Sequence, residues 1–156
     1  AVQIFDSWAG ILGASEYARF ALPFVTRMVE GVRDLGVPII YFINGAPHLI
    51  EAAASGGADV LGVCWRTPLD QVAARVGPEI ALQGNLDPHV LFAEAPVIRE
   101  RVIAVLDRVA GRPGHVMNLG HGILPDTPIS SVETMVETVH GYRTGSAASS
   151  EVPCAI

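Results

Sequence analysis

The stretch Asn-Leu-Gly-His-Gly-Ile-Leu-Pro, residues 118–125, is the most informative part of the chain. It follows a short apolar segment with the character of a strand, and it precedes a segment that predicts a helix over 130–142. His121 therefore sits on a glycine-flanked loop at the carboxyl end of a strand. Folds that alternate strands and helices place their functional side chains at such ends. The stretch predicts an α/β architecture and a functional imidazole.

The same order of strand, loop and helix recurs on the N-terminal side of this loop. Strands are predicted at 2–5, 38–43, 59–64, 80–83 and 115–119, and helices at 15–35, 48–55, 68–76, 96–110 and 130–142. Ser15 and Thr67 are the expected N-caps of two of these helices, with Pro68 in a first helical position. Gly36 ends the first helix. Such alternation builds a parallel sheet through right-handed crossovers.

The predicted fold class is α/β, with five consecutive βα units of a (β/α)8 barrel of the TIM type, incomplete on its own. A barrel needs eight units and about 250 residues, whereas this chain has 156 and begins inside its first predicted strand. Five strands leave two open edges and an uncovered inner face, which invite pairing with another chain. We expect residues 1–144 to form the barrel portion and residues 145–156 to be a flexible tail.

Composition excludes several classes of function. The formal net charge is −6 and no basic cluster is present, which argues against a nucleic-acid partner. All ten basic residues are arginine, so the chain has no lysine for a Schiff base or a P-loop. No apolar run reaches the roughly 18 residues of a membrane helix. Cys64 and Cys154 lack ligand spacing and are expected to be free thiols in a reducing cytoplasm.

Four strings carry a resemblance to a known family. They are Val-Gln-Ile-Phe-Asp-Ser-Trp-Ala-Gly at 2–10, Phe-Ala-Leu-Pro-Phe at 20–24, Gln-Gly-Asn-Leu-Asp-Pro at 83–88 and Asn-Leu-Gly-His-Gly at 118–122. Their order and spacing resemble the C-terminal portion of uroporphyrinogen decarboxylase from Ala1 to about His140. The last two strings are the most specific.

This resemblance implies a single (β/α)8 barrel, a homodimer, and conversion of uroporphyrinogen III to coproporphyrinogen III without a cofactor. A protonated pyrrole would serve as the electron sink when each acetate side chain loses CO2. The protein would then supply a carboxylate for the ring cation, arginines for the substrate carboxylates and proton donors. The family's central aspartate, its substrate-binding arginines and its tyrosine belong to the N-terminal half. The resemblance therefore also implies a missing N-terminal partner piece.

The resemblance assigns substrate contacts to two residues of this chain. Ser7 matches the hydroxyl that touches a substrate carboxylate, and His121 matches the substrate-contacting histidine. Asp6 either points into the same cleft or forms a salt bridge within the barrel. Arg66 either meets a substrate carboxylate or pairs at the surface with Asp70, one helical turn on.

Other polar residues are interpreted as structural. Asn85 and Asp87 are expected to hold the loop after the fourth strand through bonds to backbone groups. Cys64 stands where the family usually has aspartate, which puts a polar contact at that strand end in doubt. The dispersed histidines show no metal-ligand spacing, so no metal site is expected.

Two alternatives stay open. One is a corrinoid-linked methyltransferase of the same superfamily, in which thiolates bind zinc; residues 41–45 and 120–122 offer no cysteine for that purpose. The other is a half-barrel that only associates and has no activity of its own. Absence of the family's aspartate and arginines favours this second alternative.

Overall fold

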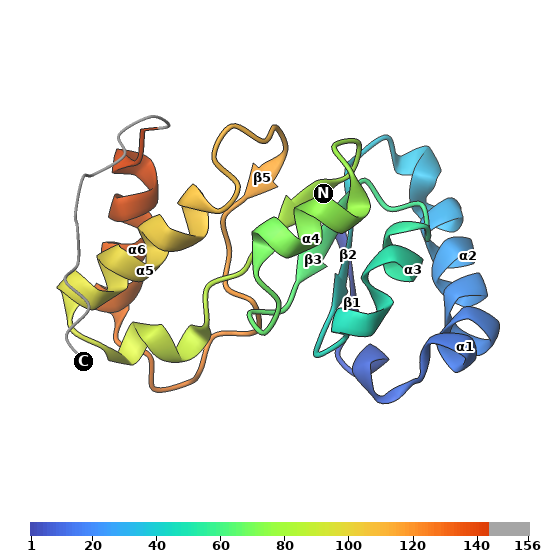
Figure 1. Ribbon diagram of the computed structural model, residues 1–156, viewed down its shortest axis with the longest axis horizontal. Helices are drawn as coiled ribbons and strands as arrows, with labels where there is room; N and C mark the ends of the chain where they lie inside the picture. The colour runs from blue at the N-terminus through green and yellow to red at the C-terminus, as the bar shows by residue number, and fades with distance from the viewer. Residues whose placement is uncertain (144–156) are drawn as a thin grey trace.

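A computed structural model describes residues 1–143 and contains one sheet of five strands (Figure 1). Each strand is parallel to its neighbour, and the order in the sheet is β1-β2-β3-β4-β5. The strands are β1 (Val2–Asp6), β2 (Ile39–Ile43), β3 (Val60–Val63), β4 (Ala81–Gln83) and β5 (His115–Val116). A doubly wound sheet reverses its strand order, whereas a barrel runs in sequence. The prediction of five consecutive units of an incomplete barrel is confirmed.

Helical segments connect all of these strands. The α-helices are α1 (Ala14–Glu16), α2 (Leu22–Val32), α3 (Ile50–Ala54), α4 (Leu69–Val76), α5 (Ala95–Asp107) and α6 (Ile129–Gly141). Shorter 3-10 turns are η1 (Ala9–Ile11), η3 (Arg33–Leu35), η4 (Pro47–Leu49) and η5 (Pro88–Phe92). In Figure 1, α2 and α3 lie at one end of the sheet, and α5 packs with α6 beyond β5 at the other.

The first predicted helix, 15–35, is divided rather than continuous. A π-helical segment, η2 (Tyr17–Ala21), separates α1 from α2. Pro23 lies in the first turn of α2. Proline has no N–H to donate and its ring clashes with the carbonyl four residues earlier, so a widened turn before it is the physical consequence. The expected N-cap Ser15 is wrong, since it lies inside α1 and Gly13 caps that helix.

Two further boundaries differ from the prediction. Helix α4 starts at Leu69 and has Pro68 as its N-cap without a side-chain cap bond, so Thr67 is not the cap. The fifth strand is shorter than 115–119 because its partner β4 already ends at Gln83. Pairing continues only through an isolated bridge between Leu86 and Leu119. The predicted tail, 145–156, lies outside the described residues.

The core lies between the sheet and its helices. Alternate side chains of β2 (Ile39, Tyr41 and Ile43) are buried there, together with Leu61 and Leu82. Within the described part of the chain no helix lies on the opposite, inner face of the sheet, and Phe5 on β1 is 69% exposed. A single sheet covered on one side only is the state expected for part of a barrel.

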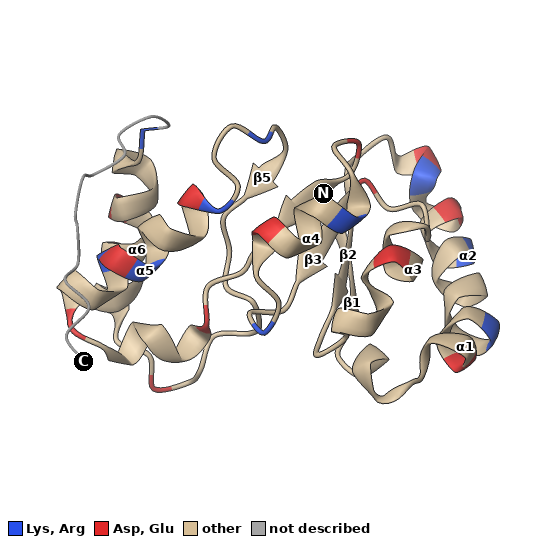
Figure 2. Cartoon of the chain, in the orientation of Figure 1, with Lys and Arg blue, Asp and Glu red and all other residues tan. Residues whose placement is uncertain are grey.

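The charged residues of the described part are spread over its surface. Figure 2 shows arginines scattered over helices and loops rather than gathered in one patch. Among residues 1–143, none of the helices has both the length and the apolar character needed to cross a membrane.

Candidate functional site

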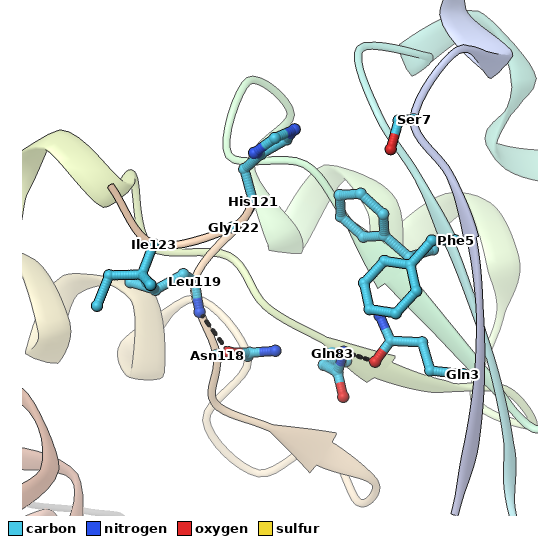
Figure 3. Close-up of a pocket in the computed structure, with 10 residues that line it drawn as sticks. Gln3, Phe5, Ser7, Gln83, Asn118, Leu119, His121, Gly122 and Ile123 are labelled. Carbon is cyan, nitrogen blue, oxygen red and sulfur yellow. Dashed lines mark hydrogen bonds between the residues drawn. The ribbon is translucent and has the colours of Figure 1, made fainter. Parts of the chain in front are cut away.

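A cleft of about 480 Å³ lies at the inner face of the sheet (Figure 3). Strands β1, β2 and β4 contribute to it, as does the loop after β5. Its lining combines aromatic and aliphatic walls with amide, hydroxyl and imidazole groups. The lining residues are Gln3, Phe5, Ser7, Phe42, Gln83, Asn118, Leu119, His121, Gly122 and Ile123.

Strand geometry brings Ser7 to this cleft. Successive side chains of a strand point to opposite faces, so Gln3, Phe5 and Ser7 share the inner face. Gln83 donates from its Nε2 to Oε1 of Gln3 at 3.2 Å, which joins β4 to β1 across the floor of the cleft. Figure 3 shows the Ser7 hydroxyl at the edge of the cleft, across from the loop that carries His121.

The same alternation turns Asp6 away from the cleft, contrary to the first expectation for it. Its Oδ2 accepts a hydrogen bond from the Tyr41 hydroxyl at 3.0 Å, and its Oδ1 accepts one from the Trp8 backbone N–H at 3.2 Å. The expected salt bridge is also absent, since neither oxygen meets a cation among the described residues. Asp6 is thus a support for the loop that presents Ser7.

A buried chain of hydroxyls stands behind Asp6. The Tyr17 and Tyr41 hydroxyls are 2.9 Å apart, and both side chains are fully buried. Because Tyr41 donates to Asp6, Tyr17 must donate to Tyr41. Burial raises the pKa of Tyr41 well above its ordinary value, with the neighbouring Tyr17 and Asp6 adding to the effect. Both phenols therefore stay protonated and act as donors.

Replacing Tyr41 with phenylalanine should destabilise the fold by about 2 kcal/mol, because it leaves the buried Tyr17 hydroxyl and one Asp6 oxygen unpaired. Tyr17→Phe should cost less, about 1 kcal/mol, since Tyr41 keeps its bond to Asp6. Urea unfolding of the two variants measures the difference. Equal costs for the two variants would contradict this direction of donation.

A series of backbone bonds positions His121. The Leu86 N–H donates to the Asn118 carbonyl at 3.1 Å, and the Gly120 N–H donates to the Leu86 carbonyl at 2.7 Å. Asn85 in turn donates from Nδ2 to the carbonyls of Cys64 at 3.1 Å and Thr67 at 2.6 Å. The loops after β3, β4 and β5 are therefore fastened to one another in order.

Two aromatic rings border the imidazole of His121. The centroid of the Trp65 ring is 5.8 Å from that of His121 and the rings meet edge to face at 84°. Phe42 is 6.2 Å away on a similar edge-to-face arrangement. Gly120 permits this approach, since a Cβ there would lie 2.8 Å from the Trp65 Cα. The imidazole itself is exposed to the cleft.

His115 supports the same loops from within. Its Nε2 lies 2.7 Å from the Gly84 carbonyl and donates to it. Burial lowers the pKa of His115 below its ordinary value, an effect partly opposed by that hydrogen bond. His115 is therefore neutral in the folded chain under conditions in which the unfolded chain takes up a proton.

The free energy of unfolding should consequently fall as the pH drops below about 6.5, which is the pKa of histidine in an unfolded chain. The unfolded state then binds a proton that the folded state refuses, so unfolding is favoured until the lower folded pKa is reached. The slope from this residue is at most about 1.4 kcal/mol per pH unit. Urea unfolding at several pH values checks it, and His115→Gln should flatten the curve in this window. An unchanged slope would contradict the assignment.

One expectation was that Arg66 pairs with Asp70 at the surface, and the structure does not show this pair. Its guanidinium lies over the Trp65 ring, with Cζ 3.9 Å from the ring centroid. Nη1 is 3.2 Å from the Cys64 sulfur and 3.4 Å from Oδ1 of Asn44. Stacking on an adjacent indole is attractive for a guanidinium, which explains why the side chain turns back instead of following the helix. Cys64 thus retains a polar contact at this strand end, through its sulfur.

Asn85 and Asp87 have the structural roles expected of them. Asn85 is buried and bonds to backbone carbonyls of the preceding loop. Asp87 caps η5, with Oδ1 accepting from the His89 backbone N–H at 3.0 Å and meeting its ring nitrogen at 2.8 Å. Neither residue lines the cleft.

Sequence reasoning did not single out Gln3, Gln83 or Trp65. A signal for the first was present, because Gln3 lies four residues before Ser7 and shares its face at a period of two. Gln83 begins one of the four strings and ends its strand facing inward. Trp65 follows β3, and nothing local in the sequence states that the loop after β5 folds over it.

This cleft can bind a ligand through its shape and through hydrogen bonds. Its apolar walls suit a flat ring, and Ser7, His121 and the amides suit polar substituents. The described residues that line it include no carboxylate and no arginine. Within residues 1–143, no cluster of histidine, cysteine or acidic side chains could hold a metal ion.

Five parallel strands in sequence, with polar side chains at their carboxyl ends, define this chain as part of a (β/α)-barrel protein. A solved methyltransferase from Methanosarcina mazei shares this fold with a TM-score of 0.77 and 20% sequence identity, over 87% of this chain and 40% of that chain. At that identity the likeness concerns the fold alone.

The family profile for uroporphyrinogen decarboxylase matches residues 1–142. The chain is 50% identical over 147 residues to a uroporphyrinogen decarboxylase from Roseiflexus sp. (strain RS-1) and 46% identical over 143 residues to one from Solibacter usitatus (strain Ellin6076). These alignments cover 91% and 92% of this chain, but 42% and 41% of the two relatives. The chain belongs to the uroporphyrinogen decarboxylase family and spans about two fifths of the length of these relatives.

Proposed function

We propose that this chain forms the C-terminal part of a uroporphyrinogen decarboxylase, active together with an N-terminal half. The reaction converts uroporphyrinogen III to coproporphyrinogen III in tetrapyrrole biosynthesis, without a cofactor. The observation that carries the proposal is the meeting of Ser7 and His121 across one cleft at the open face of the sheet. We further propose that the completed enzyme is a homodimer and works in the cytoplasm.

Each decarboxylation consists of two proton transfers and the loss of CO2. A proton adds to an α-carbon of one pyrrole, the bond between the acetate methylene and its carboxylate breaks, and that electron pair neutralises the ring cation as CO2 leaves. A second proton then returns to the exocyclic carbon while the ring loses the first. The cleft described here would hold the pyrrole against the wall that Phe5 and Phe42 form, with Ser7 donating to a substrate carboxylate.

His121 is proposed to contact the substrate from the opposite side. Its ring lies edge to face against Trp65 and Phe42, and neither ring nitrogen has a hydrogen-bond partner among the described residues. No carboxylate or arginine lines the cleft within the described residues. The group that stabilises the ring cation, and any arginine that binds a substrate carboxylate inside this cleft, are therefore assigned to the N-terminal half.

The exposed apolar surface supports association with such a half. Phe5 is 69% exposed and Ile123 is 53% exposed, both at the cleft, and Val116 on the edge strand β5 is 48% exposed. Exposed apolar groups gathered at one face of a sheet are typical of a surface that another segment covers. The open edges at β1 and β5 supply the backbone groups for strand pairing.

The test is to produce the 156-residue chain alone and together with the N-terminal portion of the Roseiflexus relative. Each sample is incubated anaerobically with uroporphyrinogen III, and the porphyrinogens with fewer carboxylates are quantified. Turnover by the pair, with none from either part alone, is the expected result. A pair that assembles without turnover would leave a half-barrel that only associates, and would overturn the decarboxylase proposal.

A further inference from the structure

A second hollow, of about 270 Å³, lies beside the cleft. It is formed at the carboxyl ends of β1, β2 and β3, and its lining includes Ser7, Asn44 and Arg66. Ser7 lines both hollows. A ligand in the cleft can therefore extend a substituent past Ser7 toward the Arg66 guanidinium.

Arg66 is held in place without a partner of opposite charge. Its guanidinium stacks on Trp65 at 3.9 Å, and its two polar contacts are with the Cys64 sulfur at 3.2 Å and the Asn44 amide oxygen at 3.4 Å. No ion pair within the described residues includes it. A guanidinium has five N–H donors, and both contacts are made by Nη1, so the donors on Nε and Nη2 have no hydrogen-bond partner among the described residues.

The surroundings of Arg66 are fixed by neighbouring loops. The Asn44 backbone N–H donates to the Asp6 carbonyl at 3.1 Å, and its Nδ2 donates to the Ser7 carbonyl at 3.3 Å. Asn44 thus has its Oδ1 directed at Arg66 while it fastens the Ser7 loop. A preorganised cation next to a hydroxyl donor, in a hollow of this size, fits a carboxylate better than any neutral group.

We propose that Arg66, with Ser7 beside it, forms a carboxylate subsite that takes one side chain of the tetrapyrrole while a pyrrole ring occupies the cleft. This inference rests on the proposed function and adds a contact from this half of the barrel. The carboxylate belongs either to an acetate, which the reaction removes, or to a propionate, which the product keeps. Arg66 holds and orients the substrate and takes no part in bond breaking.

The test measures binding rather than turnover. The chain assembled with the N-terminal portion of the Roseiflexus relative is titrated anaerobically with uroporphyrinogen III and with coproporphyrinogen III, by calorimetry. Arg66→Met keeps the aliphatic stem over Trp65 and removes the charge. Arg27→Met, on α2, is the matched control, and Arg66→Lys keeps the charge but loses the planar donor fork. Unfolding midpoints of all variants establish that they fold.

Arg66→Met should bind uroporphyrinogen III about tenfold more weakly than wild type, the size expected for one charge-assisted contact. Its affinity should also depend less steeply on salt. Arg66→Lys should lie between the two, and Arg27→Met should match wild type. Weaker binding of both ligands identifies a propionate as the occupant, and weaker binding of uroporphyrinogen III alone identifies an acetate.

Unchanged binding by Arg66→Met, or an equal loss in Arg27→Met, would overturn the subsite. If Arg66→Met fails to fold, the same comparison is made with Arg66→Lys, for which unchanged affinity overturns the proposal. Failure of the proposed function gives a different pattern. If the wild-type assembly binds uroporphyrinogen III through Arg66 but releases no CO2, the carboxylate subsite stands and the decarboxylase function is rejected.

Discussion

Gly120→Ala should destabilise the fold by about 3 kcal/mol, the upper range for overpacking a close contact, and should displace His121 from the cleft. A Cβ at this position would lie 2.8 Å from both Cα and Cβ of Trp65 and closer still to its backbone nitrogen. The obstruction is backbone rather than the end of a flexible side chain. Either the loop after β5 or the loop after β3 must therefore move.

The chain offers a matched control two residues away. A Cβ added at Gly122 would meet no heavy atom within 4 Å, and its backbone does not have a positive φ. Gly122→Ala should therefore be close to neutral, although it flanks the same histidine. Urea unfolding gives the stability of both variants. Tryptophan fluorescence, to which Trp65 contributes, reports on the packing of the loop after β5 against the loop after β3. Equal behaviour of the two variants would show that the contact between the loops does not hold His121 in place.

His121→Asn should lower turnover of uroporphyrinogen III by about a hundredfold in the proposed assembled decarboxylase, the size expected when a contact that positions the substrate is lost. The imidazole is exposed and makes edge-to-face contacts rather than hydrogen bonds within the described structure. Stability should therefore change little. The rate of coproporphyrinogen formation and the unfolding midpoint separate these two effects.

His140→Asn is the control for this second experiment. His140 lies in the last turn of α6, away from the cleft lining. It should leave both rate and stability unchanged. A full rate from His121→Asn would remove the imidazole from the proposed mechanism, while leaving the family assignment intact.

The sequence predicted best the residues of the site that directly follow a strand. Ser7 follows β1 and His121 follows β5, and the carboxyl ends of parallel strands meet at one edge. Their arrival in one cleft follows from that rule. The rule says nothing about which face a residue takes, and Asp6 shows the consequence. One residue before Ser7, it points to the helices and bonds to Tyr41.

Tertiary contacts account for the remaining errors. Helix spacing placed Arg66 near Asp70, but stacking on Trp65 competes with an exposed ion pair, which is worth less than about 1 kcal/mol. The π-helical turn before α2 follows from Pro23, a local signal that hydrophobic periodicity alone does not include. Trp65 as a neighbour of His121 required knowledge of how two distant loops pack.

The hydrogen bonds between the loops have a consequence for how this chain tolerates recombination with its relatives. Loops after β3, β4 and β5 are bonded in order through Asn85 and Leu86, and the loops after β1 and β2 form a separate pair through Asn44. Among residues 1–143, the two groups of loops are joined by the hydrogen bond from Arg66 Nη1 to Asn44 Oδ1, at 3.4 Å. Hybrid genes joined inside α3 should therefore inherit each group whole, whereas joints inside α5 should divide a bonded series and yield misplaced histidines.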